Sequence, residues 1–553
     1  MRPRAVTHAP PLLRRYAGAL LFCASLLVSS CSIHRPPERG IELLPVPESY
    51  TLYDESAPFP ERWWQVFESQ ELNRLVSEAV SENFTLQQAA ARLLQAGAVA
   101  EQTGALRWPE VTGNAQGSVS VRHTDTGESV SEFDTFAQKV SAAGSLVSGS
   151  TIGTTGSAGS ASTTVRTAQS RLQALQTLLS EPPDTEFTET TRSFLLGLTT
   201  SYEADLWGRL KADHEAARLD FEAARENVYA GMQTVAAQVA LTWLDIVSAR
   251  QSLEVVRAQL ESNRTTLELV ELRYRKGLAT ALDVYQQRQA VAQSESAIPT
   301  FESQLETLRH ELAALLGKPP RADLGLASSA FPDLPALPER GLPADLLANR
   351  PDVRAAGLQL CAADWSVTAA RAERLPALRL TPSANYSANE WELLFDNWVA
   401  TLAGSITAPV FDAGRRKAAV ERWRAVADER LVAYREAVVQ AVKEVEDALV
   451  REAKQRDYLS ALERQYEAAR ATHREALSRY RKGLNDYLPV LSALQNAQQL
   501  ERSLVQARHD LYVFRVQLHL ALGGTWMRNS AAPAEAAAWK EHEHDERTGK
   551  QST

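Results

Sequence analysis

Two long stretches of the chain carry an uninterrupted helix-forming pattern. From Arg209 to Arg275, and again from Arg415 to Arg481, there is no proline, and most residues are Ala, Glu, Arg, Leu or Gln, which favour helix. About 67 residues at ~1.5 Å each make a helix of roughly 100 Å. A helix of that length needs lateral packing along its whole extent, so these stretches do not belong to an ordinary globular core.

A glycine follows each of these stretches. After Gly277 and after Gly483, a second helical pattern runs back for about 35 residues. It ends at Gly317 in the first case and at Gly523 in the second. We therefore expect two very long helical hairpins, each with its tip at the first glycine.

The two hairpins are copies of one unit. The word Arg-Tyr-Arg-Lys-Gly-Leu at Arg273–Leu278 returns at Arg479–Leu484, an offset of 206. The residues that precede the helices match at an offset of 267, since Trp108–Val111 aligns with Leu375–Leu378. Such self-similarity predicts two structural repeats. They cover residues 61–317 and 346–525, and a proline-rich connector at 318–345 separates them.

Alternating apolar residues predict strands just before each long helix. The same spacing of two recurs from Leu378 to Tyr386, from Ala400 to Val410 and, in the first copy, from Phe194 to Thr200. We expect four paired strands of about 9–11 residues, the length that crosses a bilayer when tilted. The alternative is a soluble hairpin that rests on the helices.

Four strands per chain cannot close a barrel, because the smallest membrane barrels use about eight. An open sheet in lipid would leave the backbone groups of its edges without hydrogen bonds. If the strands enter a membrane, several chains must therefore pool them.

The first copy holds 61 extra residues, because the offset changes from 267 to 206. They fall in a segment at about 113–191, in which residues 141–164 are almost entirely Ser, Thr, Gly and Ala. This composition predicts a long, flexible surface loop between two strands.

The start of the chain has the pattern of a secretory signal. Residues 1–30 carry four arginines, a short apolar run and two serines before Cys31, and the run is too short to span a membrane. Val28–Cys31 resembles a bacterial lipobox, which implies cleavage before Cys31 and acylation of this residue. The next residue is Ser32, and not the aspartate that resembles an inner-membrane retention signal, which implies transport to the outer membrane. The alternative is an ordinary signal with a chance cysteine. We expect a lipidated linker at 31–60 and a polar, disordered tail at 526–553.

Charge and motif content exclude other classes of function. Removal of the four signal arginines takes the net charge from −9 to −13, which argues against nucleic acid as a partner. The sequence has no nucleophile elbow, no zinc-binding spacing and no glycine-rich phosphate loop. We therefore expect no catalytic residue, no metal site and no cofactor.

Strand hairpins between long helices, duplicated behind a lipobox, resemble the outer membrane factor family, the TolC-like channels of tripartite efflux pumps. The NodT-type lipoprotein branch is the most similar. The matching words include Tyr-Glu-Ala-Asp-Leu-Trp-Gly-Arg at 202–209, Asn-Arg-Pro-Asp-Val-Arg at 349–354, Ala-Pro-Val-Phe-Asp-Ala-Gly-Arg at 408–415, and the two tips.

This resemblance implies a mixed α and β membrane protein without enzymatic activity. Three chains would form a homotrimer, in which four transmembrane strands per chain give a twelve-stranded β-barrel in the outer membrane and the long hairpins form a periplasmic α-barrel. A periplasmic adaptor (membrane fusion) protein would dock at the tips, and an inner membrane transporter of the RND type would supply the energy. The alternative function is that of a periplasmic coiled-coil adaptor or a structural lipoprotein.

The resemblance also implies a gate at the periplasmic tips. Asp283 matches an aspartate that bonds to a tyrosine of the other tip, here Tyr480. Such a bond would contribute about 1.5–3 kcal/mol. The alternative is that both are solvated helix residues. The expected tip and gate residues are Tyr274, Gly277, Asp283, Tyr480, Gly483 and Asp486.

The second tip departs from the family pattern. The acidic positions six and nine residues after its glycine hold Pro489 and Ser492. An acidic ring at the aperture is therefore doubtful, although Asp486 could replace part of its charge. Pro489 is tolerable only in the first turn of the return helix.

Overall fold

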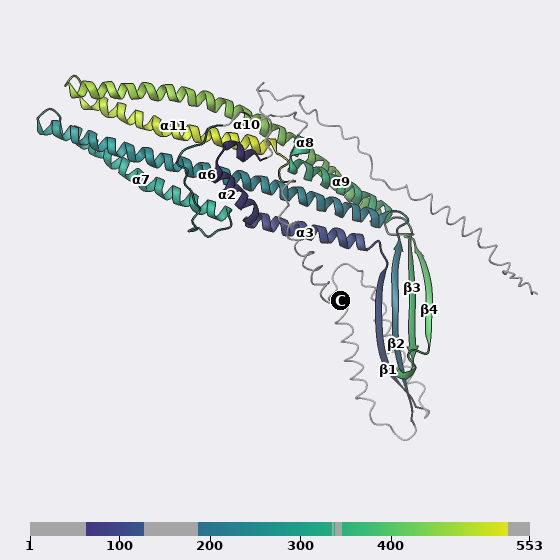
Figure 1. Ribbon diagram of the computed structural model, residues 1–553. Coiled ribbons are helices and arrows are strands. Elements are labelled where there is room, and N and C mark those ends of the chain that lie inside the picture. The colour runs from purple at the N-terminus through teal and green to yellow at the C-terminus, as the bar shows by residue number, and fades with distance from the viewer. Residues whose placement is uncertain (1–61, 126–185, 335–336, 338–345, 529–553) are drawn as a thin grey trace, which may run out of the picture. The chain divides into compact units, whose positions relative to one another are not determined.

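The computed structural model describes residues 62–125, 186–334, 337 and 346–528 (Figure 1). The predicted signal sequence, Cys31, the 31–60 linker and most of the predicted tail lie outside these residues. The chain divides into a helical unit and a strand unit. The strand unit comprises Pro109–Glu203 and Leu378–Ser405, and the remainder belongs to the helical unit.

Two helical hairpins dominate the helical unit (Figure 1). The long helices α6 (Arg209–Arg275) and α10 (Arg415–Arg481) have 67 residues each, which confirms the predicted bounds. The return helices are α7 (Ala281–Leu315) and α11 (Tyr487–Leu522). In Figure 1 the two hairpins lie side by side, and their tips are at the same end.

Shorter helices complete this unit. They are the 3-10 turn η1 (Trp63–Phe67), α2 (Gln70–Glu82), α3 (Phe84–Ala105), α8 (Leu346–Asn349) and α9 (Pro351–Ala372). None of the helices in the described ranges is both long and apolar enough to cross a membrane.

The same combination of a glycine and an upstream aspartate starts both long helices. A glycine with positive φ precedes each one, Gly208 at +72° and Gly414 at +86°. An upstream aspartate then accepts hydrogen bonds from the first-turn backbone. Asp205 accepts from Leu210 N at 3.1 Å, and Asp412 accepts from Arg416 N at 3.2 Å. These carboxylates satisfy amides that have no partner within the helix.

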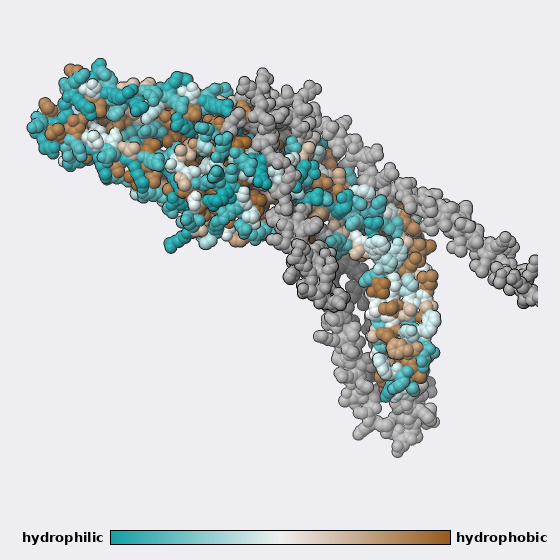
Figure 2. Space-filling model, viewed as in Figure 1, coloured by the Kyte–Doolittle hydropathy of each residue, from teal (hydrophilic) through white to brown (hydrophobic). Residues whose placement is uncertain are grey.

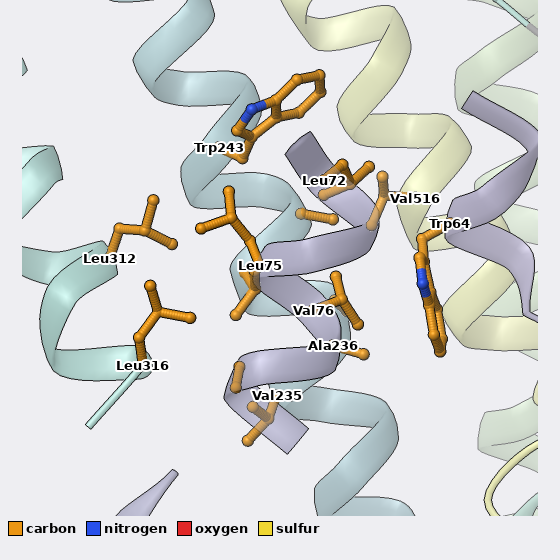
Figure 3. Close-up of a cluster of buried hydrophobic side chains, with 14 of the residues drawn as sticks. Trp64, Leu72, Leu75, Val76, Val235, Ala236, Trp243, Leu312, Leu316 and Val516 are labelled. Atoms are coloured by element: carbon orange, nitrogen blue, oxygen red, sulfur yellow. The ribbon is translucent and has the colours of Figure 1, made fainter. Parts of the chain in front are cut away.

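The main hydrophobic core lies where the short helices pack on the hairpins (Figure 3). Trp64 and α2 face α6, with α7 on one side and α11 on the other. The labelled core residues are Trp64, Leu72, Leu75, Val76, Val235, Ala236, Trp243, Leu312, Leu316 and Val516.

The predicted tail at 526–553 is wrong at its start. Trp526 and Met527 are buried in this core, and the Trp526 ring meets Trp64 edge-on with 4.7 Å between centroids. Burial of a tryptophan in an aromatic cluster outweighs the polar character of the residues that follow.

The strand unit is one sheet with the order β1-β2-β3-β4. The strands are β1 (Glu110–Asp125), β2 (Glu186–Ala204), β3 (Ala377–Ala388) and β4 (Trp398–Thr407), and the short turn η3 (Trp391–Leu393) follows β3. Four strands were predicted and four are present in the described residues. In the space-filling view, hydrophobic side chains gather on the surface of these strands (Figure 2), and Leu198, Val399 and Leu402 are exposed there.

Two predictions about the first strand pair are wrong. β1 and β2 have 16 and 19 residues, which exceeds the expected 9–11. The predicted loop at 113–191 is therefore too long, because 113–125 and 186–191 are strand. Both strands remain in antiparallel register from Glu110 opposite Ser201 to Asp125 opposite Glu186. Val119 and Val121 alternate with serines, a strand pattern that the small polar composition obscured.

Candidate functional site at the hairpin tips

The repeated Tyr-Arg-Lys-Gly-Leu word forms the same helix ending at both tips. In the first tip Leu278 N donates to Arg273 O at 2.8 Å, and Gly277 N donates to Tyr274 O at 2.9 Å. In the second tip Leu484 N donates to Arg479 O and Gly483 N donates to Tyr480 O, at 2.9 and 3.0 Å. This pair of bonds is the Schellman motif, which satisfies the last carbonyls of a helix.

The two tip glycines are required by backbone conformation. Gly277 has φ of +73° and Gly483 has φ of +74°, in the left-handed region that other residues rarely adopt. No atom would lie within 4 Å of an added Cβ at either position. Space therefore does not restrict these positions, and the predicted turning points are confirmed.

The return helices start in different ways. In the first tip, Thr280 and Asp283 form a capping box: Asp283 N donates to Thr280 Oγ1 at 3.2 Å, and Thr280 N donates to the Asp283 carboxylate at 2.8 Å. In the second tip, Asp486 is the N-cap of α11 without a side-chain capping bond. Pro489 is the third residue of α11, so it lies in the first turn as predicted.

The two tip tyrosines have opposite environments. Tyr274 is 49% exposed, whereas Tyr480 is 3% exposed and packs with Val270, Val284 and Tyr487. The rings of Tyr480 and Tyr487 are 5.5 Å apart. The Arg273 guanidinium lies over the Tyr480 ring at 4.4 Å, so the end of α6 covers the end of α10 in a cation–π contact.

The expected bond between Asp283 and Tyr480 is absent in this structure. The Tyr480 hydroxyl is buried and makes no hydrogen bond to any described residue, and the Asp283 carboxylate accepts from Thr280 instead. The interpretation missed Thr280, three residues before Asp283, which recruits this carboxylate into the capping box. The alternative that both residues are solvated is also wrong for Tyr480, which is buried.

Burial and neighbouring charges make the two buried phenols harder to ionise than a free tyrosine. Burial raises the pKa of Tyr480, the Arg273 guanidinium offsets part of this rise, and the Asp283 carboxylate adds to it. Burial also raises the pKa of Tyr487, and the nearby Tyr480 and Asp283 raise it further.

A row of polar side chains continues from the tips between the two hairpins. Tyr487 of α11 donates to the Gln287 side chain of α7. Gln287 Nε2 donates to Asn263 O at 2.7 Å, and Gln498 Nε2 donates to Asn263 Oδ1 at 3.2 Å. Deeper in the bundle, Gln259 Nε2 donates to Gln498 O at 3.0 Å. Beyond the apolar cluster around Tyr480, the hairpins therefore meet through hydrogen bonds, where an apolar seam would be usual.

Sequence reasoning missed this row. Gln259, Asn263 and Thr266 are buried on the face of α6 that also carries Val256 and Val270. Their spacing of four and three is that of core positions in packed helices. Polar residues at these core positions are the sequence signal that could have predicted the row. No group of three or more His, Cys, Asp or Glu in the described ranges could hold a metal ion.

Comparisons with known proteins agree with this geometry. The family model described as "Outer membrane efflux protein" matches residues 75–318 and 342–524. The pyoverdine export outer membrane protein OpmQ of Pseudomonas putida is 30% identical over 92% of this chain and 97% of its own length. The cation efflux system protein CusC of Escherichia coli is 26% identical over 92% of this chain and 99% of its own.

Solved structures share the fold. The outer-membrane channel OprN matches with a TM-score of 0.72 and 25% identity, over 89% of this chain and 98% of that protein. The predicted resemblance to the outer membrane efflux channels is thereby confirmed, and a periplasmic coiled-coil adaptor is not the class to which this protein belongs. The chain is a member of the outer membrane efflux protein family.

Proposed function

We propose that this chain is the outer membrane channel subunit of a tripartite export system, and that three copies form a passive duct without catalytic activity. The observation that carries the proposal is the pair of long hairpins, joined at their tips by the buried Tyr480 under Arg273. Helices of 67 residues extend about 100 Å, enough to line a tunnel across much of a periplasm.

The strand unit supports the trimer. β1 and β4 are the edges of the four-stranded sheet, and apolar side chains on the sheet are exposed. In lipid, unpaired strand edges and isolated sheets are not tolerated. Pairing β4 of one copy with β1 of the next would satisfy every edge, and three copies would close a twelve-stranded barrel.

Exposed side chains at the tips support the proposal that a partner protein docks there. Apolar side chains around both turns are exposed although they surround a buried cluster: Leu278, Leu282, Tyr285, Leu484 and Leu488. A group of exposed apolar side chains at the end of a helical hairpin is typical of a protein contact. We assign it to a periplasmic adaptor, whose binding would release the tips. An inner membrane transporter would then supply energy and select the cargo, because the named relatives export pyoverdine and cations alike.

Cys31 adds a lipid anchor to this proposal. Val28–Cys31 has the lipobox pattern, and an acyl chain on Cys31 would hold the start of each chain at the outer membrane. One acyl chain alone binds membranes weakly, so the anchor would act together with the strands.

The test is the conductance of the purified complex. The detergent-corrected mass should correspond to three chains. In a planar bilayer the unmodified complex should conduct poorly, and Arg273→Met should raise its conductance by removing the charge over Tyr480. Arg479→Met is the matched control, because Arg479 occupies the same position in the second tip and, among the described residues, its side chain pairs with the exposed Glu475. A bilayer-inserted complex that never conducts would refute the duct.

A further inference from the structure

The starts of the two long helices differ sharply in charge. At an offset of 206, Arg209, Lys211 and Arg218 of α6 correspond to Arg415, Lys417 and Arg424 of α10. The first ten residues of α6 carry a net charge of +1, whereas the first ten of α10 carry +4. The chain as a whole is acidic, with a net charge of −9. The start of the long helix is therefore strongly basic in the second copy and nearly neutral in the first.

The basic residues of α6 are neutralised locally. Arg209 pairs with Asp213 at 3.3 Å, and Arg218 pairs with Glu215 at 3.0 Å. In α10 the position of Asp213 holds Ala419. These two ion pairs therefore neutralise most of the positive charge at the start of α6.

Several cations at the start of α10 have no ion pair among the described residues. Arg416 pairs with Asp412 at 3.3 Å and Lys417 lies 3.8 Å from Glu421. Arg415, Arg422 and Arg424 are exposed and have no ion pair with any described residue. Arg415 and Arg422 are two turns apart on one helix face, about 10 Å along the axis, which is close to the screening length in physiological salt.

Two apolar residues precede these cations, separated from Arg415 by Asp412, Ala413 and Gly414. Val410 is 97% exposed and Phe411 is 90% exposed. At the equivalent start of α6, Leu206 and Trp207 are only partly exposed, and Trp207 Nε1 donates to Pro376 O at 2.7 Å. A fully exposed Val-Phe pair followed by unpaired arginines is typical of a segment at a membrane surface.

The position of these residues in the chain is consistent with a membrane surface. β4 ends at Thr407, and seven residues separate it from Arg415, a span of at most about 25 Å. If β4 lies in the bilayer, the start of α10 lies at its periplasmic boundary.

We propose that the start of α10, from Val410 to Arg424, binds the headgroups of anionic phospholipids at the periplasmic surface of the outer membrane. This inference rests on the proposed membrane insertion of the strands. Val410 and Phe411 sit in the interfacial layer, and Arg415 and Arg422, which share one face of α10, contact lipid phosphates. A negative lipid surface attracts each nearby basic residue with a several-fold gain in affinity, and the paired start of α6 lacks this attraction.

The test measures lipid binding to the full-length complex. Delipidated protein in neutral detergent is titrated with phosphatidylglycerol or phosphatidylcholine, and retained lipid is read by native mass spectrometry. The unmodified complex should prefer phosphatidylglycerol, and the preference should weaken as salt is added. The change Arg415→Gln with Arg422→Gln should lower the affinity for phosphatidylglycerol at least tenfold, and lysines at the same positions should retain it.

The first repeat supplies the control. Arg209→Gln with Arg218→Gln should leave the affinity for phosphatidylglycerol unchanged. Equal loss in this control, or no preference for phosphatidylglycerol in the unmodified complex, would overturn the inference. So would a double variant that dissociates into single chains with unchanged lipid affinity, because the surface would then be a subunit contact. A conducting channel without lipid preference refutes only this inference, whereas failure to enter a bilayer counts against the proposed function.

Discussion

The closed tip should depend on the ring of Tyr480 and not on its hydroxyl. The ring is 3% exposed, so Tyr480→Ala removes a buried aromatic side chain, at a cost of about 3–5 kcal/mol. If Tyr480 leaves its pocket on opening, a loss of about 3 kcal/mol shifts the closed-to-open ratio by roughly a hundredfold. The contact with Arg273 at 4.4 Å contributes about 0.5–1 kcal/mol of this.

Tyr480→Phe should behave differently. The hydroxyl is buried without a hydrogen bond among the described residues, so its removal should be neutral or slightly favourable to the closed state. A bond to Asp283, as the family resemblance implied, would instead make Tyr480→Phe open the channel. Tyr274→Ala is the matched control, because Tyr274 occupies the same Schellman position and is 49% exposed.

The assay is single-channel recording in planar bilayers, with the open fraction measured for each variant. We expect a large rise for Tyr480→Ala and no rise for Tyr480→Phe or Tyr274→Ala. An equal rise for Tyr480→Phe would show that the hydroxyl holds the tip closed. No rise for Tyr480→Ala would place the closure elsewhere.

Three further outcomes are expected. Cys31→Ser should abolish incorporation of a labelled fatty acid, and label that persists in the variant would end the lipoprotein proposal. Gly277→Ala and Gly483→Ala should each destabilise their tip by about 1–2 kcal/mol, because a side chain is forced into left-handed backbone; hydrogen exchange at the tips should quicken to a similar extent in both. Glu452→Gln should destabilise the helical unit by about 3–5 kcal/mol, since it weakens a buried bidentate pair with Arg515 at 2.6 and 3.0 Å; chemical unfolding that matches the unmodified protein would contradict this.

The helical hairpins could be predicted almost to the residue. Their bounds follow from local signals that nothing distant overrides: Gly208 and Gly414 before the helices, Gly277 and Gly483 after them, and no proline between. The duplication supplied a second, independent copy of each signal. Where the end of a helix depends on backbone conformation alone, the local sequence is sufficient to predict it.

The failures have a different cause. Trp526 is buried because the distant Trp64 offers an aromatic face, and a local polar composition cannot reveal such a partner. The ends of β1 and β2 depend on mutual pairing through 16 residues, not on the propensity of either strand. Long-range pairing overrides local composition in both cases.

The duplicated tips show how one backbone can serve two roles. Both copies keep the Schellman turn, because a helix must end there. Around it the side chains have diverged: Thr280 and Asp283 form a capping box in the first tip, whereas Asp486 and Pro489 occupy those positions in the second. A capping box fixes the first return helix by side-chain bonds of its own. The second return helix lacks them and meets the first hairpin through Tyr487 and Gln287 instead. Its start thus depends more on the neighbouring hairpin than on its own cap, so separation of the two tips must break the bond between Tyr487 and Gln287, whereas the capping box of the first tip can persist.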